Sequence, residues 1–293
     1  MLIKAGFRMR YALPQPTPML AMLHIHRDRE HDLKQADQLI VEPGVRVRTY
    51  TDNFGNTCSR FLAPAGQITL RSDAVVLDSG QPDDFAPLAS PVPIDQLDPA
   101  VMPFLLQSRY CDSDLLAPFA WQQFGNIEPG WAQVQAICDF AHNHLEFGYH
   151  HASLQRTASM ALQDKRGVCR DFAHLAIALC RAINIPARYC SGYLGDIGVP
   201  RDPAPMDFSA WFEVYLDGRW FSFDARHNMP RIGRIVMTRG RDAADTTLVM
   251  TFGPHILEQF EVYTDEIVEA DGPAIVQQAG SRSFFGGHGM AAE

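Results

Sequence analysis

A cysteine near the middle of the chain has the surroundings of a nucleophile. Cys169 follows Arg166 and Gly167 and stands at the predicted start of a helix. Unpaired backbone N–H groups and the positive end of the helix dipole favour a thiolate there, and such a position can lower a cysteine pKa from ~8.5 to ~3.5–7.5. Gly167 would let the chain turn sharply and a substrate come close. The alternative is a cysteine that only packs in the first turn.

A serine and an aspartate lie on a predicted β-hairpin further along the chain. Its two-residue turn is Asp217-Gly218, a strong signal between alternating aromatic and β-branched residues. This turn pairs Trp211 with Asp224, and because side chains alternate with period two, Ser209 shares their face. Ser209 is then the diagonal neighbour of Asp224, ~7–8 Å away between backbones. A histidine at position 209 would bridge that gap.

Two segments carry a resemblance to a known family, GVCRDFAHLAIALCRAINIPARYCSGYL and DFSAWFEVYLDGRWFSFDARHN. They resemble the core of the transglutaminase-like superfamily, in its bacterial branch of predicted cysteine proteases. The resemblance covers about 105–267, and RYCDSDLL and the β-rich N-terminal half resemble the same branch. It implies a papain-like α+β core in which a cysteine attacks an acyl group and a histidine and an aspartate complete a triad. By position, these are Cys169 and Asp224, while the histidine falls on Ser209.

The serine at this position leaves the proton-transfer step open. A hydroxyl can hydrogen-bond, but near neutral pH it cannot accept and return a proton as imidazole does. Losing a general acid–base costs roughly 10²–10⁴-fold, so a slow reaction could survive on thiolate and oxyanion donors. His227 would substitute only if a bulge turned it, because an unbroken strand points it to the other face. His150, His151 and His255 are further candidates in segments that the sequence does not place.

Two residues are candidates for substrate binding. Gln163, six residues before Cys169, could donate a hydrogen bond to an oxyanion, or it could be a solvated glutamine at a helix end. Trp211 could form a wall of the acyl pocket, or it could simply pack on its strand. Histidine pairs elsewhere lack a third ligand, so we expect no metal. No phosphate-binding loop is present, and we expect no cofactor.

Composition limits the class of protein and its partners. The chain has 293 residues, 46% of them hydrophobic and 20% charged, which is typical of a globular protein with two domains. Its net charge of −9 comes without a basic block, which argues against nucleic acid and anionic membranes as partners. The apolar runs are too short for a signal peptide or a membrane span, so we expect a cytoplasmic location. The six cysteines are too dispersed to suggest a disulfide framework.

Periodicity changes along the chain and predicts an α+β fold. Residues 1–85 are expected to form a small β-sandwich, and the prolines of 86–103 a linker. Residues 104–268 are expected to form the transglutaminase-like core, with helices on an antiparallel sheet. One helix begins near Pro129 and a second runs from Cys169 toward Pro186. The glycine- and alanine-rich segment 269–293 is predicted to be a flexible tail.

Two functional hypotheses follow. The first is thiol-mediated acyl transfer or hydrolysis on a peptide or protein substrate, with Cys169 as nucleophile, Asp224 as orienting carboxylate and Ser209 at the histidine position. It predicts that iodoacetamide labels Cys169 well below about pH 8, ahead of the other cysteines. The second is a catalytically degenerate core retained as a binding or scaffold module. Substrate identity, the choice between water and amine as acceptor, and the oligomeric state stay open.

Overall fold

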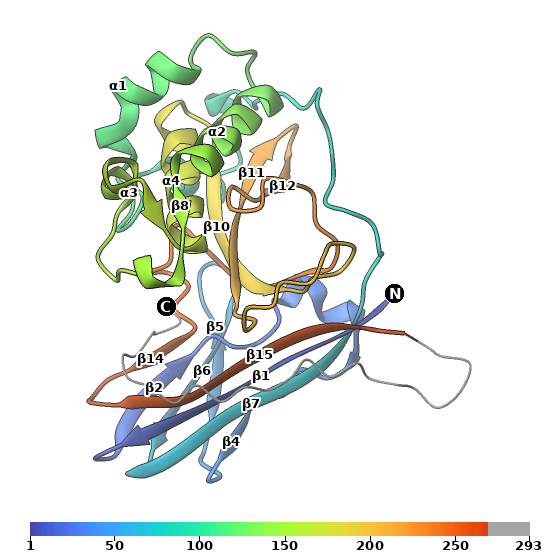
Figure 1. The fold of residues 1–293 in the computed structure, drawn as a ribbon, viewed down its shortest axis with the longest axis vertical. Coiled ribbons are helices and arrows are strands. Elements are labelled where there is room, and N and C mark those ends of the chain that lie inside the picture. The colour runs from blue at the N-terminus through green and yellow to red at the C-terminus, as the bar shows by residue number, and fades with distance from the viewer. Residues whose placement is uncertain (269–293) are drawn as a thin grey trace.

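The computed structural model describes residues 1–268 and has an α+β fold, as the sequence predicts. Helices gather at one end of the molecule and long strands lie at the other (Figure 1). No helix in this part of the chain is long and apolar enough to cross a membrane. The predicted tail, 269–293, lies outside the described residues.

The strand-rich end consists of two antiparallel sheets. The first has the order β15-β1-β7-β3, with β4 also paired to β7. The second has the order β14-β2-β6-β5. Their bounds are β1 (Leu2–Leu13), β2 (Thr17–Ala21), β3 (Leu33–Gln35), β4 (Ile40–Glu42), β5 (Arg48–Thr51), β6 (Thr57–Ala63), β7 (Gly66–Leu77), β14 (Val249–Thr251) and β15 (Ile256–Ile267). Both sheets contribute to one hydrophobic core that includes Phe7, Met19 and Leu70.

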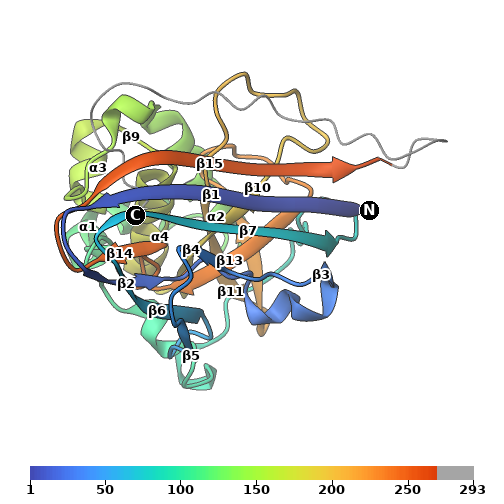
Figure 2. The ribbon, with the colours of Figure 1, turned by 90° about the horizontal axis from the view of Figure 1, so that it is seen from below.

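The two sheets contain strands from both the beginning and the end of the described chain. Residues 249–267, which the sequence pattern placed in the core domain, instead pair with N-terminal strands. Figure 2 shows β15, β1 and β7 side by side. The physical reason is that β1 buries alternate residues along its whole length and takes a partner on each side. Period-two alternation identifies a strand but does not identify which distant strand will pair with it.

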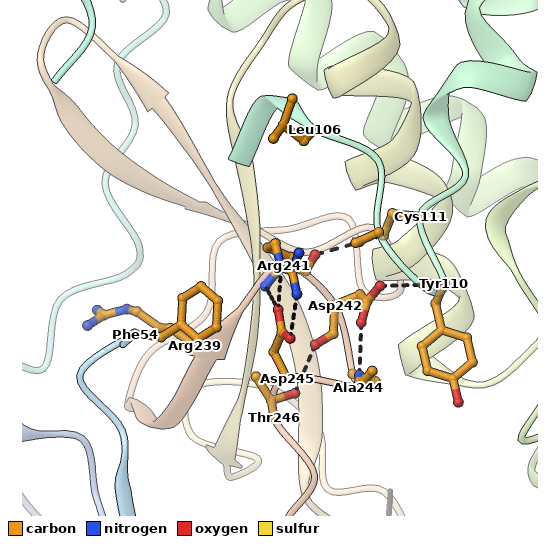
Figure 3. Close-up of polar contacts among 12 residues, drawn as sticks. Phe54, Leu106, Tyr110, Cys111, Arg239, Arg241, Asp242, Ala244, Asp245 and Thr246 are labelled. Atoms are coloured by element: carbon orange, nitrogen blue, oxygen red, sulfur yellow. Dashed lines mark hydrogen bonds and ion pairs between the residues drawn. The ribbon is translucent and has the colours of Figure 1, made fainter. Parts of the chain in front are cut away.

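The segment between the sheets and the first α-helix has no α-helix or β-strand, in keeping with its prolines. Four short 3-10 helices occur in residues 1–268, at η1 (Arg27–Asp32), η2 (Ile94–Gln96), η3 (Met102–Leu105) and η4 (Tyr149–His151). The chain just before α1 is fixed to a turn near residue 242. There the backbone N–H of Tyr110 donates to Oδ2 of Asp242 over 2.7 Å, and Ala244 donates to Oδ1 (Figure 3). These bonds anchor the chain where it enters the helical layer.

The helical layer surrounds one central helix. It contains α1 (Ser113–Phe124), α2 (Trp131–His144), α3 (Ala158–Asp164) and α4 (Cys169–Ala182). The other three α-helices all contact α4, as do two strands of the neighbouring sheet. Every residue from 170 to 181 is buried. The helix predicted to begin near Pro129 is α2, and its residues Trp131, Val134, Cys138 and Ala141 are all buried.

A four-stranded antiparallel sheet supports α4. Its order is β12-β11-β10-β13, with bounds β10 (Ala187–Leu194), β11 (Ser209–Leu216), β12 (Arg219–Phe223) and β13 (Arg234–Gly240). The hairpin has the predicted register, with Glu213 opposite Ser222, and both turn residues, Asp217 and Gly218, have positive φ. The predicted pair of Trp211 with Asp224 does not form, because β12 ends at Phe223.

Candidate active site

Cys169 is the first residue of α4, and a short pair of strands leads the chain to it. β8 (Glu146–Phe147) runs parallel to β9 (Arg166–Gly167), with Phe147 opposite Gly167. Cys169 then packs at the edge of the core between α4 and the sheet. The thiol accepts a hydrogen bond from the backbone N–H of Ala210, near the start of β11. Cys169 is half-buried, whereas the other five cysteines are buried. It is therefore the cysteine best placed to meet a substrate.

The structure overturns the expected acidity of this thiol. Burial raises the pKa of Cys169 to about 11, although the charge of Arg226 and the N–H of Ala210 both lower it. The carboxylate of Asp207 raises it further. The prediction of a lowered pKa is wrong because desolvation of the thiolate outweighs the favourable end of the helix. At neutral pH the resting residue is a thiol, and a base must remove its proton during attack.

A buried carboxylate fixes the first turn of α4. Oδ2 of Asp171 accepts a hydrogen bond from the N–H of Val168 over 2.9 Å and another from Nη1 of Arg156 over 3.2 Å. A Cβ at Gly167 would lie 2.5 Å from Cβ of Asp171 and 2.6 Å from its Oδ2. Gly167 is thus required by the close approach of Asp171, and not by a substrate as the sequence suggested. This contact fixes the position at which α4, and with it Cys169, begins.

Asp224 follows the last residue of β12 and makes four hydrogen bonds. Its Oδ2 accepts from Nδ1 of His227 over 2.8 Å and from Nη2 of Arg234 over 3.0 Å. Its Oδ1 accepts from the backbone N–H groups of Arg226 and His227, each over 3.0 Å. Burial alone would raise the pKa of Asp224, but the charge of Arg234 and the bonds from His227 hold it well below its usual range. Asp224 is therefore a carboxylate at neutral pH.

The turn that carries these residues lies beside the nucleophile. The guanidinium of Arg226 stands 3.8 Å from the centre of the Phe147 ring. Phe147 pairs with Gly167, two residues before Cys169, and the charge of Arg226 acts on the thiol. Helix α2 also holds Arg226, because the imidazole Nδ1 of His142 donates to its backbone carbonyl over 2.8 Å.

Asp207 is a site residue that the sequence pattern did not reveal. It lies two residues before Ser209, and its Oδ1 accepts a hydrogen bond from the N–H of Phe208 over 2.7 Å. Burial raises the pKa of Asp207 to about 6, against the lowering effects of this bond and of Arg226. Its charge acts on Cys169 and on Tyr149. The one available signal was its place just before a strand that carries a family motif.

The remaining predicted site residues make no hydrogen bond to the thiol in residues 1–268, although Ser209 directly precedes Ala210. Ser209 is buried, and its hydroxyl has no hydrogen-bond partner within residues 1–268. Trp211 packs with Cys190 and Val236, outside the core that α4 shares with the sheet, and lines a cavity of about 240 Å³ together with Arg234. Gln163 is exposed on α3.

Among the candidate substitutes for the triad histidine, His227 contacts Asp224. His150 and His151 lie on η4, and the ring of His255 bonds to Thr251 at the strand-rich end. None of these three has a hydrogen bond to Asp224 in the described part of the chain. No group of three or more His, Cys, Asp or Glu residues able to hold a metal ion occurs in residues 1–268.

A cysteine at the start of a buried helix, a supporting antiparallel sheet and a carboxylate after its hairpin define a papain-like α+β core. Residues 119–225 match the sequence model of the transglutaminase-like superfamily. The chain belongs to this superfamily.

Similar proteins extend the match beyond the core. A candidate cysteine protease from Cytophaga hutchinsonii, known as a crystal structure, is 31% identical and superposes with a TM-score of 0.78, covering 95% of this chain and 94% of its own. An uncharacterized protein of Mycobacterium tuberculosis is 30% identical over 234 residues, 72% of this chain and 73% of its own length. One of Mycobacterium leprae is 28% identical over 223 residues, 69% and 75% respectively.

Proposed function

We propose that the protein catalyses acyl transfer or hydrolysis at peptide or amide bonds, with Cys169 as the nucleophile. The observation that carries this proposal is the position of the Cys169 thiol. It lies at the first residue of α4, accepts a hydrogen bond from the N–H of Ala210 and is less buried than the other five cysteines. Membership of the transglutaminase-like superfamily supports the same chemistry.

The start of α4 supplies donors for the oxyanion that such a reaction forms. The first N–H groups of a helix have no carbonyl partners within it and point toward its N-terminal end, where negative charge is favoured. A tetrahedral intermediate formed on Cys169 would carry its oxyanion close to these donors. Collapse of the intermediate would expel an amine and leave a thioester on Cys169. Water would then give hydrolysis, and an acceptor amine would give transfer.

A degenerate binding or scaffold module is the second candidate. It is favoured by the serine at position 209 and by the raised pKa of the Cys169 thiol. In this case the papain-like core would be kept for its surface, and the thiol would have no catalytic partner.

Acylation by 4-nitrophenyl acetate separates the two candidates. An enzyme should release 4-nitrophenolate in a burst and acquire one acetyl group, which peptide mass spectrometry should locate on Cys169. The variant Cys169→Ala should abolish the burst, and Cys58→Ala, at a buried cysteine of β6, should keep it. A wild-type chain that is not acetylated at Cys169 would overturn the proposed reaction and favour the scaffold.

A further inference from the structure

We infer that His227 is the general base and acid of this site, replacing the histidine that the family pattern places at position 209. The inference rests on the proposed function and concerns its missing proton-transfer group. Ser209 cannot fill this role, because a hydroxyl does not exchange protons readily near neutral pH. Cys169 needs such a group, since its pKa of about 11 keeps it protonated.

The hydrogen bond to Asp224 determines which nitrogen of His227 is available. Because Asp224 is ionised, its Oδ2 can only accept, and Nδ1 of His227 must donate across the 2.8 Å between them. The neutral imidazole then has its lone pair on Nε2. This is the arrangement in which a carboxylate holds one ring nitrogen and the other serves the nucleophile. The ring is accessible, with 24% of the His227 side chain exposed.

The chain turn brings His227 to the correct side of Asp224. A continuing strand would have pointed it to the opposite face, but β12 stops at Phe223. The backbone N–H of Asn228 then donates to the carbonyl of Asp224 over 2.8 Å, which closes a turn. Asn228 also bonds to Asp139 of α2 over 2.8 Å. His227 is thus fixed by its own side chain, its own N–H and the residue after it.

The same turn lies against the segment that leads to the thiol. Arg226, directly before His227, stands on the Phe147 ring, and Phe147 pairs with Gly167. Arg226, in the middle of the turn, therefore contacts the entry to α4, while Asp224, at its start, orients the imidazole. We place Nε2 of His227 on the thiol side of this turn.

The proposed steps conserve protons and electron pairs. Nε2 of His227 takes the proton of the Cys169 thiol while sulfur bonds to the acyl carbon and the carbonyl electron pair moves to oxygen. On collapse, the C–N bond breaks and Nε2 gives its proton to the leaving amine. Nε2 next removes a proton from the incoming water or amine, which bonds to the acyl carbon. The C–S bond breaks and the thiolate takes the proton back from Nε2.

The test compares the rate of Cys169 acetylation by 4-nitrophenyl acetate in four chains. In His227→Gln, an amide can still donate to Asp224 but cannot serve as a base. We expect its rate at pH 7 to fall about 10²–10⁴-fold. The matched control is His144→Gln, because the imidazole of His144 bonds to the carbonyl of Leu162 and not to the turn. The acetylation rate of this variant should stay within about twofold of wild type. The double variant that adds Ser209→His to His227→Gln should acetylate at least about tenfold faster than His227→Gln alone. Its new imidazole would stand at the position where the family pattern has the triad histidine.

The pH profile distinguishes proton transfer from a structural role. With His227 as the base, the wild-type rate should exceed that of His227→Gln most at neutral pH, and the difference should narrow as the thiol begins to ionise without help. In His227→Gln the rate should keep rising toward the alkaline pKa of the thiol, about 11. Wild-type rate and profile in His227→Gln would overturn the inference while leaving the proposed function intact. A wild-type chain with no acetylation at Cys169 would instead overturn the proposed function itself.

Discussion

Asp224 and Arg234 form a buried ion pair, with Nη2 of Arg234 3.0 Å from Oδ2 of Asp224. Only 1% of the Asp224 side chain and 7% of the Arg234 side chain are exposed. Nε of Arg234 also bonds to Asp83, over 2.8 Å, in the segment that follows β7. Arg234 therefore links the Asp224 carboxylate to Asp83, in the segment that connects the strand-rich end to the helices. This connection contributes to the geometry of the site.

The first prediction concerns the loss of this charge. Asp224→Asn should lower the free energy of unfolding at pH 7 by about 3–5 kcal/mol, because it leaves Arg234 with one of its two carboxylates. Since the pKa of Asp224 is lowered in the folded chain, its contribution is present above the unfolded pKa and disappears as pH falls through the folded value. Urea denaturation from pH 7 to pH 2 should show the difference from wild type shrinking only in strong acid.

A more exposed pair provides the control for this measurement. Asp245 bonds to Arg241, whose side chain is 42% exposed. Asp245→Asn should therefore cost no more than about 1 kcal/mol. If both substitutions lower the free energy of unfolding equally, burial does not increase the contribution of the Asp224–Arg234 pair to stability.

The second prediction concerns alkylation of cysteines by iodoacetamide. Cys169 should react first, because the other five cysteines are buried. Its rate should nevertheless rise steadily with pH toward about 11, and at pH 8 it should be slower than in the urea-unfolded chain, since burial raises the folded pKa. Mass spectrometry of quenched samples measures both rates. A plateau below pH 8 would show that the folded site stabilises the thiolate.

Local sequence signals predicted much of the fold. The Asp217-Gly218 turn determined the hairpin register, and the sequence pattern identified α2 and α4 as helices. Such features depend on residues close together in the chain. The pairing of β15 with β1 joins residues more than two hundred positions apart, and no short pattern encodes it.

The site was predicted only in part, for a different reason. Cys169 and Asp224 carry family motifs, but the pKa of the thiol depends on how completely the fold removes water around it. The contact of His227 with Asp224 depends on where β12 stops, and strand ends are the least determined part of a period-two pattern. Asp207 begins the second family segment, but its effect on the thiol depends on how the fold places the start of β11 against Cys169.

The third prediction tests the packing at the entry to α4. In Gly167→Ala, the new Cβ would approach Asp171 to about 2.5 Å, so Asp171 must move away from Val168 and Arg156. We expect the free energy of unfolding to fall by about 1–3 kcal/mol. Gly44→Ala is the matched control, because a Cβ there meets nothing within 4 Å. Thermal unfolding of both variants measures the difference, and similar melting temperatures would refute the proposed clash.

The fourth prediction concerns the partly buried carboxyl of Asp207, which lies before β11. Burial raises the pKa of Asp207 from 3.8 to about 6, so the folded chain binds a proton more tightly than the unfolded chain. Stability should therefore fall as pH rises between about 4 and 6, by about 1–3 kcal/mol, and the loss should persist at higher pH. Asp207→Asn carries no such charge and should be more stable than wild type above pH 6. Urea denaturation at pH 4 and pH 8 measures both effects.

The same substitution should change the reactivity of the thiol. The carboxylate of Asp207 raises the pKa of Cys169, so its removal should lower that pKa and speed alkylation of Cys169 at pH 8. Asp202→Asn is the control, because Asp202 is an exposed acidic residue of the same connection between β10 and β11. An alkylation rate in Asp207→Asn equal to that of the control would show that Asp207 has no influence on the nucleophile. A faster rate together with the gain in stability would show that the fold keeps an unfavourable charge beside its thiol.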